Sequence, residues 1–377
     1  MPYYLRHHFD PFFDHTNLSP AAQPRGKVDH YCLSYVQNVV KGQIIAELLP
    51  LPEGHSEAEH VLDIHEQFIF ATPTLPVGPN TQVNPLNDRQ LLATHNGYVF
   101  YHKGLISVKK LLNIHGPVDF HTGNVLFIND ICVEGPVRSG FELQGRNILL
   151  QDTVEGAKIK AHNNLTAECG IKGAKICEID AGETIKAAFC ENCQLTAGAD
   201  IVIEGSSLHS HLSVNGQLIV KERLQGGTVY ANDVVYIGEQ LGGGINTPTS
   251  IVMGYPPILL KKVEMIEEKI TIAKARIKTL RDVSAKSDLH RAENLASLTF
   301  EERRFDALRR ELRRIMALMQ KHANVTACRI IVPGVIRPGV EISIGRQYTK
   351  INDYLENVTV NLRDGELLFE SPAIHTK

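Results

Sequence analysis

The sequence predicts a mainly β protein: a right-handed parallel β-helix with a small N-terminal β domain and an inserted antiparallel coiled-coil hairpin. Three observations predict it. A short apolar repeat runs from residue 118 to residue 237, a heptad pattern replaces it after residue 256, and strand-turn-strand patterning returns at 332–345. A switch of apolar period from two to three and a half indicates a helical insertion in a β fold.

The repeat defines the β-helix. Each unit reads apolar, any, apolar, turn, apolar, any, apolar, so one face of each short strand points inward. Copies start at 118, 141, 159, 179, 195, 212 and 229, and the first two have one extra turn residue. The turns, such as HNN at 162–164 and NGQ at 215–217, supply the Asn and Gly that a corner favours. A mean spacing of about 18 residues fits one coil of a parallel β-helix.

The gaps between copies bear on handedness. They are 23, 18, 20, 16, 17 and 17 residues, mostly not multiples of six, which argues against a left-handed hexapeptide helix. Parallel crossovers are otherwise right-handed. An antiparallel sandwich with unusually regular turns remains the alternative fold.

The region before the repeat predicts a different β domain. Residues 39–50 read as strand, turn, strand, and Asn96-Gly97 is a hairpin signal. The pattern resembles the barrel-sandwich domains of biotinyl and lipoyl carriers, although Lys41 lacks their modification context. Residues 1–24 form an arm expected to pack on the body or on another chain. The arm contains Tyr3, Tyr4, His7, His8, Phe9, Phe12, Phe13 and His15.

Two heptad seams predict the hairpin. The first seam consists of Leu259, Val263, Ile266, Ile270, Ala273, Ile277 and Leu280, and the second of Phe305, Leu308, Leu312, Ile315 and Met319. A polar stretch at 284–298 separates them, and Thr299 with Glu302 reads as a capping box that starts the second helix. The predicted division is 1–24 arm, 25–105 small β domain, 106–254 β-helix, 255–328 hairpin, and 329–377 strands that complete the β-helix.

Cysteine and histidine supply the candidate metal ligands. Cys190 and Cys193 have CxxC spacing without a second pair at zinc-ribbon distance. His209 and His211 are two residues apart, which would place both imidazoles on one face of a strand. The alternatives are buried apolar thiols and surface imidazoles. The Gly-rich stretch 238–254 lacks the order of a nucleotide loop, and no catalytic motif is found. We therefore expect no cofactor and no enzymatic activity.

Charge is segregated along the chain. Residues 257–323 contain 16 Lys and Arg against 10 Asp and Glu, whereas the whole chain has a net charge of −3. The basic cluster consists of Arg303, Arg304, Arg309, Arg310, Arg313 and Arg314. It is either a partner surface or a solvated coiled-coil face with acids at i,i+4. The one aromatic residue within the cluster, Phe305, belongs to the predicted seam, so the cluster lacks the interleaved aromatics of single-strand binders, and we expect no nucleic-acid partner.

The chain shows neither a signal-peptide pattern nor an apolar run long enough to span a bilayer, and its seven cysteines are an odd, scattered set. We expect a cytoplasmic protein with reduced thiols, with the cell pole or the inner membrane surface as further locations.

Four stretches carry a family resemblance. They are the segment that runs from KGLISVKK to GRNILL at 103–150, VEGAKIKAHNNLTAECGIKGAKI at 154–176, AGETIKAAFCENCQLTAGADIVI at 181–203 and IGEQLGGGINTPTSIVMG at 237–254. Together with the charged hairpin and the PGVIRPGVEISIG return, they resemble the flagellar assembly protein A family. The resemblance implies a cytoplasmic, non-enzymatic, bactofilin-like scaffold with a role in flagellar assembly or polar organisation that acts by protein contact. Homo-oligomerisation through the hairpin or the β-helix ends is a further hypothesis. A carbohydrate-binding or carbohydrate-active β-helix, and a nucleic-acid or membrane-surface binder using the Arg-rich helix, are the alternatives.

Overall fold

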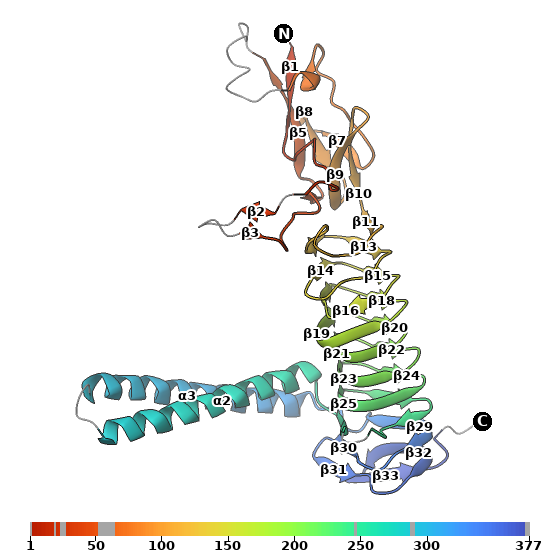
Figure 1. The fold of residues 1–377 in the computed structure, drawn as a ribbon, viewed down its shortest axis with the longest axis vertical. Helices are drawn as coiled ribbons and strands as arrows, with labels where there is room; N and C mark the ends of the chain where they lie inside the picture. The colour runs from red at the N-terminus through yellow and green to blue at the C-terminus, as the bar shows by residue number, and fades with distance from the viewer. Residues whose placement is uncertain are drawn as a thin grey trace. The chain divides into compact units, whose positions relative to one another are not determined.

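The computed structural model describes residues 2–18, 20–22, 28–51, 65–244, 247–286 and 291–373. The chain groups into two compact units, Met1–Leu195 and Thr196–Lys377. Strands dominate both units, and two long helices lie side by side in the second (Figure 1). The predicted mainly β class with a parallel β-solenoid and a helical pair is confirmed. The right-handed sense and the five domain boundaries stay predictions.

The first unit begins with two small antiparallel sheets, in the orders β6-β1-β5-β8-β7 and β10-β9-β4. Their strands are β1 (Tyr3–His7), β4 (Asn38–Val39), β5 (Ile44–Pro50), β6 (Ile69–Phe70), β7 (Thr81–Asn84), β8 (Asn87–Ala93), β9 (Gly97–His102) and β10 (Leu105–Lys109), with a 3₁₀ turn η1 (Glu66–Phe68) before β6. A separate pair consists of β2 (Ala21–Ala22) and β3 (Val28–Asp29).

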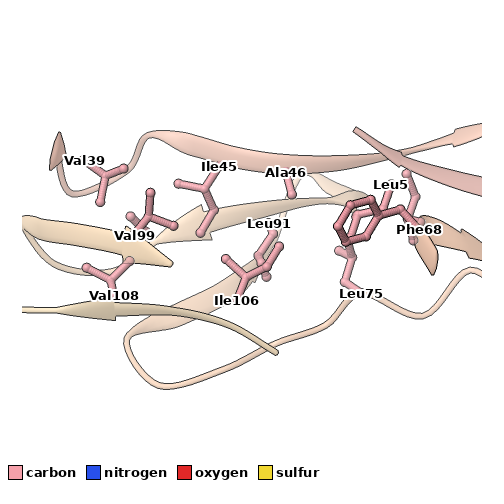
Figure 2. Close-up of a cluster of buried hydrophobic side chains, with 12 residues drawn as sticks. Leu5, Val39, Ile45, Ala46, Phe68, Leu75, Leu91, Val99, Ile106 and Val108 are labelled. Carbon is pink, nitrogen blue, oxygen red and sulfur yellow. The ribbon is translucent and has the colours of Figure 1, made fainter. Parts of the chain in front are cut away.

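One hydrophobic cluster joins the two sheets. Figure 2 shows side chains from both sheets converging on it. Leu5, Ile45 and Leu91 come from the five-stranded sheet, and Val99 and Ile106 come from the other. Burying an aliphatic side chain of this size stabilises the fold by roughly 1.5–3 kcal/mol. Shared burial of both inner faces is what makes sheets this small stable.

Two features of this region differ from the expectation. Residues 3–7, placed in the arm by the sequence, form β1 between β5 and β6. The predicted Asn96-Gly97 hairpin is wrong, because β8 and β9 belong to different sheets. Gly97 is needed for close approach instead: an added Cβ would lie 2.1 Å from the Lys109 carbonyl oxygen. The hairpin turn is at Lys103-Gly104, where both φ angles are positive.

The rest of the first unit is solenoid. Its strands are β11 (Leu111–Ile114), β12 (Val125–Leu126), β13 (Asp130–Val133), β14 (Glu142–Gly145), β15 (Ile148–Leu150), β16 (Val154–Glu155), β17 (Lys158–Ala161), β18 (Leu165–Ala167), β19 (Ile171–Ala181), β20 (Ile185–Ala187) and β21 (Cys190–Ala197), which crosses the unit boundary. Parallel pairing stacks Ile148 on Leu165 and Leu165 on Ile185. These three side chains are buried, as the inward-facing apolar pattern predicts.

The first two copies of the repeat are placed differently from the prediction. The sequence aligns Val125 with Ile148, but Val125 pairs with Leu143. Phe120, expected to point inward, is exposed. The extra turn residue in these copies permits more than one alignment by spacing alone. Backbone pairing selects the alignment in which Ile131, not Val125, stacks on Ile148.

A polar ladder fixes one corner of these coils. The Asn147 side-chain amide donates to Asp130 Oδ1 at 2.9 Å, and the Asn164 amide donates to Glu183 Oε2 at 3.1 Å. Arg146 donates two hydrogen bonds to Asp130, which hold the pKa of that carboxyl below its ordinary value. Each bond joins one coil to the next, so the ladder resists slippage between coils.

The solenoid strands of the second unit follow the same rule. They are β22 (Ile201–Ile203), β23 (Ser207–Val214), β24 (Leu218–Val220), β25 (Arg223–Ala231), β26 (Val234–Ile237), β27 (Gln240–Leu241), β28 (Thr249–Met253), β29 (Arg329–Ile336) and β30 (Val340–Ile344). Ile201, Leu218, Val235 and Ile330 stack in one parallel column. The last step joins residues on either side of the hairpin, so the chain rejoins the stack after the insertion, as predicted.

The hairpin consists of α2 (Pro257–Lys286) and α3 (Arg291–Lys321). At 1.5 Å per residue, α2 is about 45 Å long. Ile266 and Ile270 of one seam pack with Ile315 and Met319 of the other, as the heptads predict. The capping box is wrong: Thr299 lies inside α3, and its hydroxyl donates to the Leu295 carbonyl at 2.8 Å.

Antiparallel strands close the C-terminal end. These strands are β31 (Gln347–Lys350), β32 (Leu355–Arg363) and β33 (Glu366–Glu370). The strand β31 pairs with β30, β32 pairs with β29, and β33 pairs with β32, all antiparallel. Val358 and Val360 of β32 are buried. The cap covers backbone groups and apolar side chains that an open coil would expose.

Two glycine substitutions measure how closely neighbouring coils approach. Gly227 and Gly365 both have positive φ, +89° and +82°. A Cβ at Gly227 would lie 2.0 Å from the Ser210 carbonyl oxygen, whereas nothing lies within 4 Å at Gly365. We expect Gly365→Ala to cost about 1 kcal/mol of unfolding free energy, and Gly227→Ala about 2–4 kcal/mol. Urea denaturation measures both, and equal losses would contradict the close approach.

Candidate functional site

The CxxC pair lies in the solenoid wall. Cys190 and Cys193 are both buried in β21, with Asn192 between them at a φ of +51°. The left-handed residue turns the strand from one face to the next, so both thiols occupy interior positions. Among the described residues, no group of three or more His, Cys, Asp or Glu side chains is placed to hold a metal ion.

The other buried thiols, Cys177 and Cys328, are expected to be unreactive. Burial raises the pKa of Cys177 to about 11 and that of Cys328 to about 12. A thiol with a pKa this high stays protonated near neutral pH and is a poor nucleophile or metal ligand. These cysteines therefore behave as small apolar core residues.

The histidine pair is split by a bend. His209 is half-buried at the bend of β23, where its φ is +49°, and His211 is exposed further along the strand. The sequence expected both imidazoles on one face, but the left-handed residue falls at His209 itself. Ser207 and Ser210, on either side of His209, are both buried. The arrangement parallels that of Cys190, Asn192 and Cys193, which shows a backbone role for the position.

Among the described histidines, His7 has the most strongly shifted pKa. Its ring makes edge contacts with Phe9, Phe68 and Tyr101, at centroid distances of 5.2, 4.3 and 5.9 Å. Its Nε2 is buried without a hydrogen-bond partner among the described residues. Burial lowers the pKa of His7 to about 4, with a smaller contribution from His8. The neutral imidazole acts here as part of an aromatic cluster.

The helical hairpin buries a carboxylate, Glu301, that the sequence analysis did not predict. Glu301 is 8% exposed, and its Oε1 lies 3.4 Å from Arg276 Nη1 and 3.5 Å from Arg304 Nη1. It lies four residues before Phe305 and so extends the α3 seam by one position. Its other carboxylate oxygen is buried without a hydrogen bond within the described structure. The heptad spacing of the α3 seam, extended four residues towards the N-terminus from Phe305, was the sequence signal that could have identified Glu301 as a seam residue.

The six arginines of the predicted partner surface are all exposed on α3: Arg303, Arg304, Arg309, Arg310, Arg313 and Arg314. Arg304 contacts Glu301, and Arg309 lies over the Phe305 ring at 5.7 Å. The remaining four have no ion-pair partner among the described residues. Glu302, expected to pair along α3, instead accepts a hydrogen bond from Arg281 of α2 at 2.7 Å.

The base of the hairpin is tied to the coils. The Tyr230 hydroxyl of β25 donates a hydrogen bond to Glu264 of α2. Burial first, and then the Glu264 carboxylate, raise the pKa of Tyr230 above its ordinary value. The Asn324 backbone N–H, just after α3, donates to the Gly254 carbonyl just before α2, at 3.0 Å. The hairpin therefore leaves and rejoins the stack at one place.

These features define a class: β-solenoid proteins with a helical hairpin inserted between coils and an antiparallel cap at the C-terminal end. A family model for the Flagellar Assembly Protein A beta solenoid domain matches residues 110–367. The match spans well over half of the chain, and the chain belongs to this family. Neither the curated proteins nor the solved structures contain a significant match. Within the described part of the chain, neither helix offers a stretch long and apolar enough to cross a bilayer.

Acidification should reveal the cost of burying His7. The fold lowers its pKa from the ordinary 6.5 to about 4, so the unfolded chain binds the proton more tightly. Stability present above pH 6.5 is therefore lost as the pH falls towards 4. We expect the urea midpoint of His7→Phe to fall less over this range than that of the wild type. Parallel midpoint curves for the two proteins would contradict the buried neutral imidazole.

Replacing the seam carboxylate should strengthen the hairpin. Glu301→Leu removes a poorly paired buried charge and restores an apolar heptad position, so we expect about 1 kcal/mol of added unfolding free energy. Glu302→Leu, at a more exposed site, should change stability by less than about 0.5 kcal/mol. Denaturation followed by helical circular dichroism measures both. Destabilisation by Glu301→Leu would show that the carboxylate supports the fold.

Proposed function

We propose that this protein is a non-enzymatic scaffold of flagellar assembly that acts through protein contacts in the cytoplasm. The observation that carries the proposal is the family match over residues 110–367. The interior of the solenoid supports it, because columns such as Ile201, Leu218 and Val235 fill it with aliphatic side chains. A solenoid interior filled in this way leaves the outer surface and the helical insertion as the parts that contact other proteins.

We place the protein-partner surface on α3, at Arg303, Arg310, Arg313 and Arg314. Their guanidinium groups are exposed, and no acidic side chain among the described residues neutralises them. Guanidinium pairs well with carboxylates in bidentate geometry, so an acidic protein surface is the chemistry that fits. If that partner protein is located at the cell pole, this protein is recruited there as well. No observation on the described residues favours the carbohydrate or nucleic-acid alternatives.

Removal of the protein from its native host should change the number or placement of flagella, scored by electron microscopy. Re-expression of the wild-type chain should restore the pattern, and the Arg303→Glu/Arg310→Glu variant should not. Lys186→Glu/Arg223→Glu makes the same charge change on exposed solenoid positions and should restore it. Unaltered flagella in cells without the protein would refute the flagellar role.

A further inference from the structure

One line of α2 alternates exposed apolar and cationic side chains. Ile258, Met265 and Ile272 are seven residues apart, and they are 66%, 49% and 47% exposed. Lys262, Lys269 and Arg276 follow each of them by four residues and are also exposed. Eighteen residues make five helical turns, so Ile258 and Arg276 mark the two ends of one stripe. The stripe is separate from the buried seam that packs against α3.

A similar stripe runs along α3. Phe300 is 67% exposed, and Leu318, also exposed, lies eighteen residues and five turns further on. Arg304 and Arg314 lie between them on the same side. A hollow of about 680 Å³ near the far end of the hairpin is lined by both Arg276 and Phe300. The two stripes therefore lie on the same side of the hairpin, and we call them together the stripe face.

The stripe face is accessible and cationic. Glu264, which binds Tyr230 at the base, lies six residues after Ile258 and so on another side of α2. Five cations lie beside the apolar residues of this face: Lys262, Lys269, Arg276, Arg304 and Arg314. Arg276 and Arg304 share the Glu301 carboxylate, and Lys262, Lys269 and Arg314 have no ion-pair partner among the described residues. Among the described residues, Glu311 is the exposed acid on the α3 stripe. A ligand for this face must supply anions and apolar contact together.

We propose that the stripe face docks on an anionic phospholipid bilayer surface. Headgroup phosphates lie next to acyl chains in such a surface, which matches the alternation of Lys or Arg with Ile, Met, Phe and Leu. A second copy of the same face would bring like charges together, and duplex nucleic acid offers no apolar surface for Ile258, Met265 and Ile272. The helices lie on the bilayer rather than cross it. The inference does not depend on the flagellar role.

Co-sedimentation of the full chain with vesicles of equal parts phosphatidylglycerol and phosphatidylcholine tests the proposal. We expect binding that weakens with added salt and is absent with phosphatidylcholine alone. Lys262→Glu/Lys269→Glu should weaken binding about tenfold or more, since it replaces two basic residues that attract the anionic surface with two acids that it repels. Met265→Ser/Ile272→Ser should also weaken binding, because it removes the apolar contacts.

The matched control is Lys274→Glu/Lys278→Glu, which makes the same charge change on the other side of α2, where both lysines line a hollow with Phe305. It should retain most of the binding, and circular dichroism checks that every variant keeps its helices. The proposal is overturned if the wild type ignores anionic vesicles. It is equally overturned if the two double-lysine variants lose vesicle binding to the same extent. Binding of the wild-type chain to duplex DNA or to an acidic helical peptide, but not to vesicles, would overturn it too.

Discussion

The structure depends on one constraint: each coil must present its backbone and its inward aliphatic residues to the next coil in register. A single coil cannot bury its apolar face alone, so stability comes from stacking. Ile201, Leu218, Val235 and Ile330 illustrate the rule, because the column continues through residues separated by the whole hairpin. The insertion is tolerated since the chain leaves at Gly254 and returns at Asn324, whose N–H binds the Gly254 carbonyl. The same constraint requires the antiparallel cap.

Where apolar periodicity was strong, the sequence was sufficient to predict the fold. Alternation predicted the coils from residue 159 onward, and heptads predicted both seams. The prediction failed where local signals permit two outcomes. An extra turn residue left the alignment of Val125 open, and only backbone pairing settles it. Thr299 has capping chemistry, but its hydroxyl bonds back to Leu295 within a helix that tertiary packing extends to Arg291. The sequence of β1 has no clear strand pattern. The strand forms because its backbone pairs with β5 on one side and β6 on the other.

The ion pairs of the candidate site were also not predictable from residue spacing along one helix. Acids interleaved with arginines on α3 suggest pairing along one helix, which would neutralise the basic surface. In the hairpin, Glu301 and Glu302 reach across to Arg276 and Arg281 of α2. Cross-helix pairing depends on the register of the two helices, which spacing within either helix does not specify. The consequence is that four arginines on α3 have no ion-pair partner among the described residues. At the candidate metal ligands, a corner residue with positive φ, Asn192 or His209, determines which neighbouring side chains point inward.

Segregation of charge distinguishes the hairpin from the coils. Residues 257–323 have six more basic than acidic residues, although the chain as a whole is net negative. Counterions screen charges beyond about 8 Å at physiological salt, whereas α2 is about 45 Å long. The local excess of cations on the hairpin, rather than the net charge of the chain, therefore sets the field close to the hairpin. An anionic partner, whether an acidic protein or a bilayer, is attracted by the hairpin and repelled by the rest, so the charge distribution itself determines which part binds first.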